Sequence, residues 1–269
     1  MEFTAIRPGV ETMILAEEAA TVSVIIGASA CLLVDTGSSH DRGCQIRQAI
    51  AEVTDRLLTT VVLTHGHWDH AFGLGAFADL DTIGAENLME DLLCLENQQW
   101  AGRAGLSLNE MILPATPLSL IAVRDLGGVT VEIAHFGPAH TRSDLIVAVP
   151  ETSVVLVGDL VESGPPQFDE TSSLLGWVRT LDNLKALLKD DTVIIPGHGT
   201  PLGAEQLKHF HTGLAMIWIQ SEQGYHQGLN EDQVYDQTAQ EWPWDRDDIK
   251  HGIQAAYREL TNPPQGMSR

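Results

Sequence analysis

The chain has 269 residues, of which 43% are hydrophobic, so it can form one large domain or two small ones with a substantial core. Its 37 acidic and 15 basic residues give a net charge of −22, and such a surface repels phosphate backbones, which argues against nucleic-acid binding. No apolar run is long enough to span a membrane, the N-terminus lacks a secretory pattern and the three cysteines lack CxxC spacing, so we expect a cytoplasmic protein without a disulfide framework.

The first half of the chain alternates predicted strands and helices. The apolar, β-branched run 21–35, with a glycine near its centre, predicts a β-hairpin. Apolar residues at helical spacing predict a helix over about 40–53. The apolar run 57–63 suits a strand that is buried on both faces, and a helical pattern follows over 86–103.

The second half of the chain repeats this alternation. Short β-branched runs predict four strands, over residues 129–136, 145–149, 153–157 and 192–195. Apolar residues on one face predict an amphipathic helix over 174–188. We expect residues 1–269 to form a single domain with a mainly helical C-terminal portion over about 203–262. This order of elements favours two packed sheets with helices on their outer faces.

Seven metal-capable side chains lie at the ends of predicted strands or beside glycine or proline. Three imidazoles and one carboxylate fall within residues 65–70, directly after the apolar run 57–63. The seven residues are His65, His67, Asp69, His70, His140, Asp159 and His198. Neutral imidazole and carboxylate are ligands that borderline divalent metals prefer. Because none of the ligands is cysteine, the set indicates a catalytic metal site with open positions rather than a structural zinc site.

The spacing within residues 65–70 suggests two metal positions. His65 and His67 are two residues apart, and in extended chain such a pair points to the same side, so both can bind one ion. Asp69 and His70 follow where the chain turns, and they can face a second ion. Two ions roughly 3.5–4 Å apart form a known hydrolytic arrangement.

This ordered set of ligands resembles the metallo-β-lactamase superfamily over roughly residues 10–200. The run His65-x-His67-x-Asp69-His70 carries most of the resemblance. The supporting segments are Val34-Asp35-Thr36-Gly37, Gly137-Pro138-Ala139-His140-Thr141, Val157-Gly158-Asp159 and Pro196-Gly197-His198-Gly199. The resemblance implies an α/β (α+β) fold, the four-layer αββα metallo-β-lactamase sandwich, with the site along one edge.

The resemblance also implies how the ligands are shared. One ion would be held by His65, His67 and His140, the other by Asp69, His70 and His198, and both would be bridged by Asp159. The ions would be two divalent cations, zinc by preference, with iron or manganese as the alternatives. A metal-bound hydroxide would attack a carbonyl carbon. Asp69 would be the catalytic residue that orients water or moves its proton, and Asp35 would hold the ligand loops.

Two positions separate the chain from one large group of true β-lactamases. In that group the position of Asp159 is a cysteine, and three residues later a lysine binds the substrate carboxylate, where this chain has Glu162. An acid there would repel a β-lactam carboxylate, so β-lactam hydrolysis is an alternative rather than the first choice. The aspartate bridge is more similar to the glyoxalase II, lactonase and general hydrolase branches. Residues 200–269 contain few basic residues of the kind that the glyoxalase branch uses to hold glutathione.

The leading hypothesis is a metal-dependent hydrolase that acts on a small ester, thioester, lactone or amide. The alternative from another class is an iron-dependent sulfur dioxygenase of the same superfamily, because imidazole and carboxylate also suit iron. A nuclease would need a basic groove, and a non-catalytic binding protein would be expected to lose ligands. We expect a small-molecule substrate as the partner, with no nucleic acid and no membrane, and a homodimer as the default assembly.

Several further side chains are candidates for the pocket wall. Trp68 either lines the pocket or packs beneath the metal-binding loop. Trp100, Phe168 and Trp177 are apolar groups of the kind that contact substrates, although each also suits the core. His135 is expected to be a hydrogen-bonded structural histidine.

Overall fold

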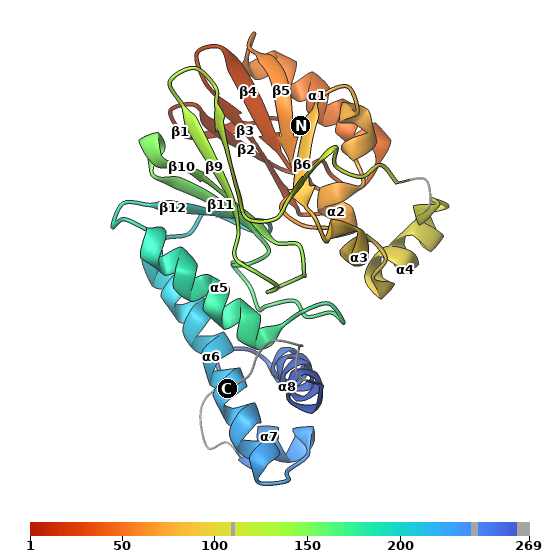
Figure 1. Ribbon diagram of the computed structural model, residues 1–269, viewed down its shortest axis with the longest axis vertical. Helices are drawn as coiled ribbons and strands as arrows, with labels where there is room; N and C mark the ends of the chain where they lie inside the picture. The colour runs from red at the N-terminus through yellow and green to blue at the C-terminus, as the bar shows by residue number, and fades with distance from the viewer. Residues whose placement is uncertain (109–110, 238–241, 263–269) are drawn as a thin grey trace.

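The computed structural model describes residues 1–108, 111–237 and 242–262. In these residues two β-sheets pack face to face, with helices on both outer sides (Figure 1). This is the four-layer αββα arrangement that the sequence predicts. No helix in the described ranges is long and apolar enough to cross a membrane.

The N-terminal sheet follows the order of the chain from β1 to β7 in the described residues. Its strands are β1 (Thr4–Arg7), β2 (Val10–Ile14), β3 (Thr21–Ile26), β4 (Ala30–Val34), β5 (Leu57–Val62), β6 (Asp81–Ala85) and β7 (Thr116–Leu118). The predicted hairpin is confirmed as β3 and β4, which pair antiparallel. The predicted strand over 57–63 is confirmed as β5, which pairs parallel with β4 and β6. Parallel pairing brings the carboxyl ends of β4 and β5 to the same edge.

The C-terminal sheet has the order β12-β11-β10-β9-β8. Its strands are β8 (Ile121–Asp125), β9 (Thr130–His135), β10 (Leu145–Val149), β11 (Val154–Gly158) and β12 (Val193–Pro196). Because β11 and β12 are parallel, Asp159 and His198 leave the sheet at the same edge. The backbone NH of Thr21 donates to the carbonyl of Gly197 at 2.7 Å, which joins this edge to the other sheet.

The helices predicted over 40–53 and 174–188 are confirmed, whereas the helix predicted over 86–103 is corrected. The observed helices are α1 (His40–Val53), α2 (Trp68–Ala71), α3 (Leu88–Leu92), α4 (Leu95–Ala104), α5 (Leu174–Leu187), α6 (Ala204–His226), α7 (Glu231–Gln237) and α8 (Arg246–Thr261). The single helix predicted over 86–103 is wrong, because α3 and α4 are separate. Cys94 has an extended backbone, with ψ 160, and its sulfur accepts from the backbone NH of Asn97, so it begins a new helix.

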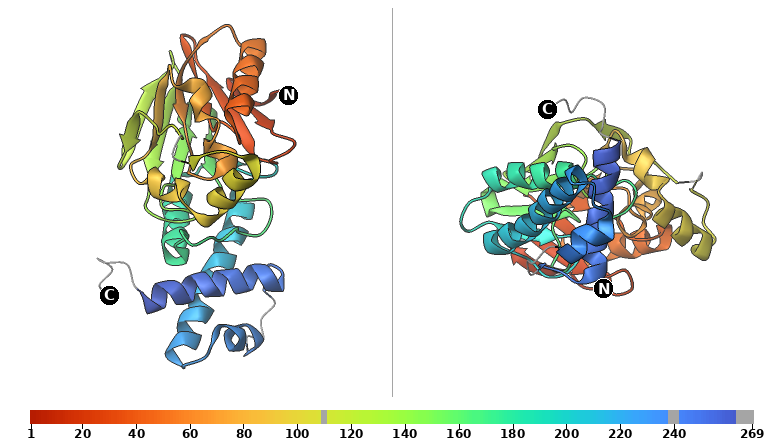
Figure 2. Two further views of the ribbon diagram at one scale, coloured as in Figure 1. Left: turned by 90° about the vertical axis from the view of Figure 1, so that its right-hand side faces the viewer. Right: turned by 90° about the horizontal axis from the view of Figure 1, so that it is seen from below.

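Three buried clusters fill the spaces between the four layers. Successive side chains of β4 point to opposite faces of the sheet. Cys31 and Leu33 pack with α1, whereas Leu32 and Val34 face the other sheet. The third cluster lies between the C-terminal sheet and α5, α6 and α8, and its largest buried side chain is Trp177. Figure 2 shows that α6 runs away from one end of the sandwich and that α8 lies across α6. The C-terminal helices therefore share a core with the sheet that carries Asp159.

Candidate metal centre

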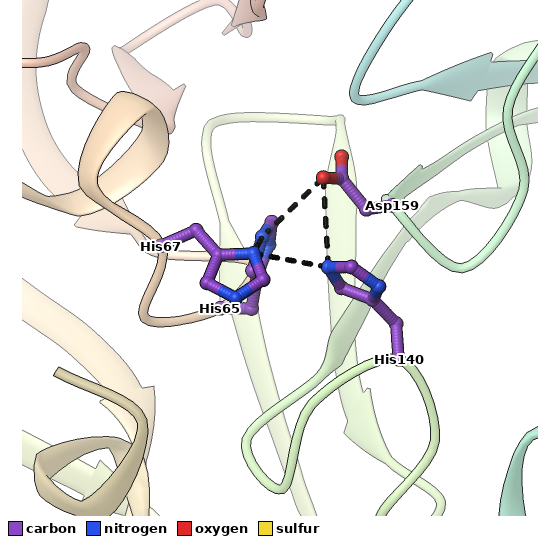
Figure 3. Close-up of side chains that lie close together, drawn as sticks. All are labelled: His65, His67, His140 and Asp159. Carbon is purple, nitrogen blue, oxygen red and sulfur yellow. Dashed lines mark hydrogen bonds and ion pairs between the residues drawn. The ribbon is translucent and has the colours of Figure 1, made fainter. Parts of the chain in front are cut away.

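The seven predicted site residues come from four chain segments that meet where β5, β11 and β12 end. His65 to His70 follow β5, and His140 lies in the loop between β9 and β10. Asp159 directly follows β11, and His198 follows β12. Figure 3 shows three of the imidazoles and the Asp159 carboxylate pointing toward one another from these segments. The structure thus brings all seven side chains together.

A one-turn helix explains how four site residues fit into six positions. His67 has an extended backbone, with ψ 150, and is the N-cap of α2. The backbone NH of His70 donates to the carbonyl of His67 at 3.1 Å, which closes the turn. This turn carries Asp69 and His70 away from the direction of His65 and His67, so the two pairs belong to different groups.

The first group contains three imidazoles and one carboxylate. His67 Nδ1 lies 3.2 Å from His65 Nε2 and 3.1 Å from His140 Nε2. Asp159 Oδ2 lies 3.5 Å from His65 Nε2 and 3.6 Å from His140 Nε2. All four side chains are buried, and their facing atoms enclose a space of the size that one metal ion fills.

The second group contains Asp69, His70 and His198. Asp69 Oδ2 lies 3.1 Å from His198 Nε2 and 3.6 Å from His70 Nε2, and the two imidazole nitrogens are 3.3 Å apart. Asp159 Oδ1 lies 3.4 Å from His70 Nε2, and its other oxygen lies 3.5 Å from His198 Nε2. Asp159 therefore faces both groups, as a bridging ligand would.

Hydrogen bonds outside the site fix the direction of every imidazole. The outer ring nitrogens have these partners: Thr64 Oγ1 for His65 at 3.0 Å, Asp169 Oδ2 for His67 at 3.0 Å, Asp35 Oδ2 for His70 at 2.8 Å, the Gln167 carbonyl for His140 at 3.1 Å, and the Ala19 carbonyl for His198 at 3.2 Å. The carbonyl and carboxylate partners accept protons, and the Thr64 hydroxyl donates its own to Asp35. Each outer nitrogen therefore carries a proton, and in a neutral imidazole the lone pair then lies on the inner nitrogen.

This arrangement fits a metal ion better than it fits any hydrogen-bond network. Five ring nitrogens and two carboxylates converge, and Asp159 Oδ1 is buried with no hydrogen-bond partner in the described residues. Buried polar atoms need partners, and a divalent cation would supply one to every inward atom. The backbone also accommodates the site, since a Cβ at Gly197 would collide with the Asp159 carboxylate.

The directions of the pKa shifts differ between the two groups. Burial lowers the pKa of His65, and burial followed by the neighbouring His67 lowers that of His140 to about 4. Burial also acts on His70 and His198, but the carboxylates of Asp69 and Asp159 outweigh it and raise their pKa values to about 9 and about 11. The two carboxylates therefore favour positive charge in the half of the site that contains His70 and His198.

Asp35 was expected from the sequence to hold the ligand loops, and its contacts match that role. It is 2% exposed, and it accepts from the Thr64 backbone NH at 2.7 Å, the Thr64 hydroxyl at 2.8 Å and His70 Nδ1 at 2.8 Å. Its backbone has a φ of +63°, a conformation that aspartate tolerates better than most residues.

Asp169 is the residue that the sequence reasoning missed. It lies in the segment between β11 and α5, and its Oδ2 is 3.0 Å from His67 Nε2, across 102 positions of sequence. Burial raises the pKa of this carboxyl, but the hydrogen bond and charge of His67 outweigh it and hold the pKa low. The only local signal is Asp169 followed by Thr171 and Ser172, a pattern that indicates a turn but not what the carboxylate faces.

The metal centre opens into a cavity of about 390 Å³. Trp68 lines this cavity and stacks on Trp100 at 4.6 Å, so it both walls the pocket and packs beneath the loop.

Trp177 is fully buried behind His140, with ring centroids 5.2 Å apart, and is a core residue rather than a substrate contact. His135 donates to the Asp144 carbonyl at 2.9 Å, as expected of a structural histidine.

Glu162, the acid expected to repel a β-lactam carboxylate, is buried beside the metal centre. It lines the cavity, and burial together with the charge of Asp159 raises its pKa to about 8. This pKa is that of the metal-free protein, and bound cations would favour the ionised carboxylate, so the repulsion of a β-lactam carboxylate stays a prediction. Glu96 also lines the cavity, as does Glu18, whose carboxylate is paired with Arg42 at 2.9 Å.

The part of the chain that contains the seven site residues matches a known protein family. The family model described as the metallo-beta-lactamase superfamily matches residues 16–198, which is more than half of the chain and ends at the last site residue. A hydroxyacylglutathione hydrolase of Haemophilus influenzae is 31% identical over 188 residues, which cover 65% of this chain and 83% of that protein.

The second relative and a solved structure extend beyond the family match. A linear primary-alkylsulfatase of Pseudomonas sp. is 23% identical over 255 residues, which cover 77% of this chain and 47% of that protein. The structure of a stereoselective inverting sec-alkylsulfatase from Pseudomonas sp. has a TM-score of 0.80 at 14% identity, and covers 99% of this chain and 51% of that one. The chain spans about half the length of these two proteins. At this level of identity the structural match shows the fold, and it includes the C-terminal helices.

Proposed function

This chain belongs to the metallo-beta-lactamase superfamily, and from that premise we propose that it is a hydrolase that uses two divalent ions, zinc by preference, to cleave a small ester, thioester, lactone or amide. One observation carries the proposal. The Asp159 carboxylate lies between 3.4 and 3.6 Å from four imidazoles that belong to two separate groups. The hydroxyacylglutathione hydrolase among its relatives supports the carbonyl class of substrate.

The proposed ligands follow the two groups. The first ion would be held by His65, His67 and His140, the second by Asp69, His70 and His198, and Asp159 would serve both. A shared carboxylate suits this role because two dications at close range repel each other and its negative charge offsets part of that repulsion. Divalent ions in such a site polarise a substrate carbonyl oxygen and make water a nucleophile at neutral pH.

Asp69 is the side chain that can accept and move a proton in the cavity. Burial raises its pKa, but the charge of His70 and the hydrogen bond with His198 outweigh this and hold the pKa below its usual value. The carboxylate is therefore ionised at neutral pH, and it lines the cavity, so it can orient a water molecule or take its proton.

The walls of the cavity favour a neutral or apolar substrate. Glu96 places an acidic group at its wall, whereas Glu18 is paired with Arg42, and Trp68 offers an apolar face. The overall charge of −22 acts in the same direction, since it repels anions from the surface. A neutral ester or lactone meets none of this repulsion.

Hydrolysis of an alkyl sulfate ester is the second candidate. The similarity to the linear primary-alkylsulfatase covers 77% of this chain and extends past the last site residue. The related sec-alkylsulfatase structure also includes counterparts of α6, α7 and α8. Against this candidate stands the acidic cavity, because a sulfate ester carries a negative charge.

A substrate panel with matched variants tests the proposal. Purified protein is assayed for metal content and for turnover of carboxylic esters, thioesters, lactones, amides, a β-lactam and an alkyl sulfate. Asp159→Ala and His67→Ala are expected to lose bound metal and to lower turnover by at least about 10²-fold, as is typical when a metal site is disrupted. His226→Ala, at an exposed histidine of α6, is the control that keeps both.

The outcomes separate the candidates. Turnover that survives in a metal-free Asp159→Ala variant ends the hydrolase proposal. Preference for the alkyl sulfate over every carbonyl substrate selects the second candidate. Iron in protein from its native host, together with oxygen consumption, would favour the dioxygenase alternative. The cytoplasmic location, the small-molecule partner and the homodimer stay predictions from the sequence.

A further inference from the structure

The two oxygens of Asp169 have separate tasks. Oδ1 accepts hydrogen bonds from the Thr171 backbone NH at 2.6 Å, the Thr171 hydroxyl at 2.7 Å and the Ser172 backbone NH at 3.0 Å. These bonds lock the carboxylate within its own loop. Oδ2 is left to face His67 Nε2 at 3.0 Å, and the carboxylate is nearly buried, with its side chain 9% exposed.

His67 differs from the other four site histidines in the atom that it turns inward. Its Nδ1 faces the centre, whereas the other four present Nε2. A neutral imidazole carries one proton, so a proton on Nε2 leaves Nδ1 with the lone pair that a metal needs. The acceptor at Nε2 decides which of the two forms is present, and that acceptor is Asp169.

The loop that carries Asp169 is tied to two other parts of the molecule. The Ser172 hydroxyl donates to the backbone carbonyl of His140 at 2.7 Å, so the loop also contacts the third imidazole of the first group. From the opposite side, Arg258 of α8 donates to the Asp169 carbonyl at 2.6 Å. Glu259 accepts from the Ser173 hydroxyl at 3.2 Å and from the Leu174 backbone NH. The C-terminal helix therefore holds the loop in place.

We propose that Asp169 is a positioning residue for the first metal site: it keeps the proton of His67 on Nε2, so that Nδ1 binds the ion, and α8 holds Asp169 in place through Arg258. This inference rests on the metal site of the proposed function. It links α8, which follows the last site residue in the chain, to the proposed ligand His67. Supports of this kind are worth about 10- to 100-fold in metal affinity.

A competing role for Asp169 is that of a metal ligand. Asp169, His67 and Cys94 lie close enough together to form a third group. One contact argues against it: His67 Nε2 already meets Asp169 at hydrogen-bond distance. Because a metal on Nε2 would displace the proton that we infer there, counting bound ions distinguishes the two roles.

The test measures zinc affinity in the full chain by competition with a chromogenic chelator. Asp169→Asn keeps an oxygen that can accept the loop hydrogen bonds, but it turns an NH₂ group toward His67 Nε2. We expect zinc binding to weaken by about 10- to 100-fold. Glu170→Gln changes the same charge at the next position, which does not contact His67, and it should bind zinc as tightly as the unchanged protein.

A measurement on the unchanged protein tests the same inference without relying on how a variant folds. In the zinc-loaded form, ¹⁵N NMR of the His67 ring should show the proton on Nε2 and the metal on Nδ1. Asp169→Asn should broaden or shift these ring signals. The reverse assignment in the unchanged protein overturns the proposal whatever the variant does.

The remaining outcomes separate this inference from the proposed function. If the unchanged protein binds no zinc, the metal site itself is wrong and both proposals fail. If it binds zinc and Asp169→Asn binds equally well, the positioning role fails and the proposed function stands. If Cys94→Ala lowers the number of bound ions by one, Asp169 is a ligand of a third site, and the positioning role is wrong.

Discussion

Two carboxylates support histidines on opposite sides of the metal centre, and they are held in different ways. Asp35, at the end of β4, accepts from His70 at 2.8 Å, and Asp169, in the loop before α5, accepts from His67 at 3.0 Å. Asp35 is fixed by the sheet, because its other bonds go to Thr64 at the end of the neighbouring strand. Asp169 is fixed by hydroxyls of its own loop and by a helix from the end of the chain. One half of the centre thus depends on the sandwich, and the other depends on the C-terminal helices.

The difference has an energetic side. Asp35 is 2% exposed, and each of its three donors would be left buried and unpaired without it. The loop of Asp169 borders a cavity of about 710 Å³ and can relax toward it. We therefore expect Asp35 to matter for folding and metal binding together, and Asp169 to matter mainly for metal binding.

The same substitution at both places should give the largest contrast. Asp35→Asn introduces a donor where the Thr64 hydroxyl and His70 already donate, so metal-free protein should lose about 2–3 kcal/mol of unfolding free energy. Asp169→Asn can keep the loop bonds and alters only the contact with His67, so it should lose less, about 1–1.5 kcal/mol. Urea denaturation of both metal-free variants measures this, and equal losses would contradict the contrast.

Metal removal should loosen one side of the centre more than the other. A ligand present at about 100 times its Kd stabilises the folded state by about 2.7 kcal/mol, and a chelator removes that contribution. Without metal, hydrogen exchange should rise more in residues 163–173 than at the end of β4, since the loop loses the ordered His67 that it contacts. An equal rise on both sides would mean that the sheet and the loop respond as one unit.

The contribution of α8 can be measured by itself. Arg258→Gln removes the bond to the Asp169 carbonyl, and because this arginine is exposed we expect zinc affinity to fall by only about two- to fivefold, or about 0.5–1 kcal/mol. Arg246→Gln is the matched control, since it lies on the same helix and pairs with Asp236 instead. A loss in both variants would point to general weakening of α8 rather than to the Asp169 contact.

The smallest effect concerns pH. Burial raises the pKa of the Glu259 carboxyl above its usual 4.5, so the folded protein holds this proton more tightly than the unfolded chain does. The stability that this group contributes is full below pH 4.5 and declines as the pH rises through the folded-state pKa. Glu259→Gln should flatten that decline in urea titrations above pH 4.5, and an unchanged slope would show that the carboxyl does not titrate in this way.

Sequence patterns predicted the side of the centre around Asp35, which the sheet forms, more fully than the side around Asp169, which the C-terminal helices support. Asp35 and the ligands after β5 stand next to apolar strand runs, so their place at a strand end follows from local sequence. Asp169 acts across 102 positions, and its neighbours reveal only a turn. The break at Cys94 was also missed, because a side-chain cap interrupts a continuous helical pattern. β8 was not predicted for a different reason: as an edge strand it is largely exposed.

The position of α8 has a practical consequence for protein engineering. A shortened version that ended soon after residue 198, where the family match stops, would keep all seven proposed ligands but lack Arg258 and Glu259. It would also strip α5 of its cover, because Leu181 and Leu184 share a buried cluster with Leu207 of α6. Such a fragment would have every coordinating group and still be a poor metalloprotein, prone to aggregate. Any minimal version should therefore retain the chain through α8.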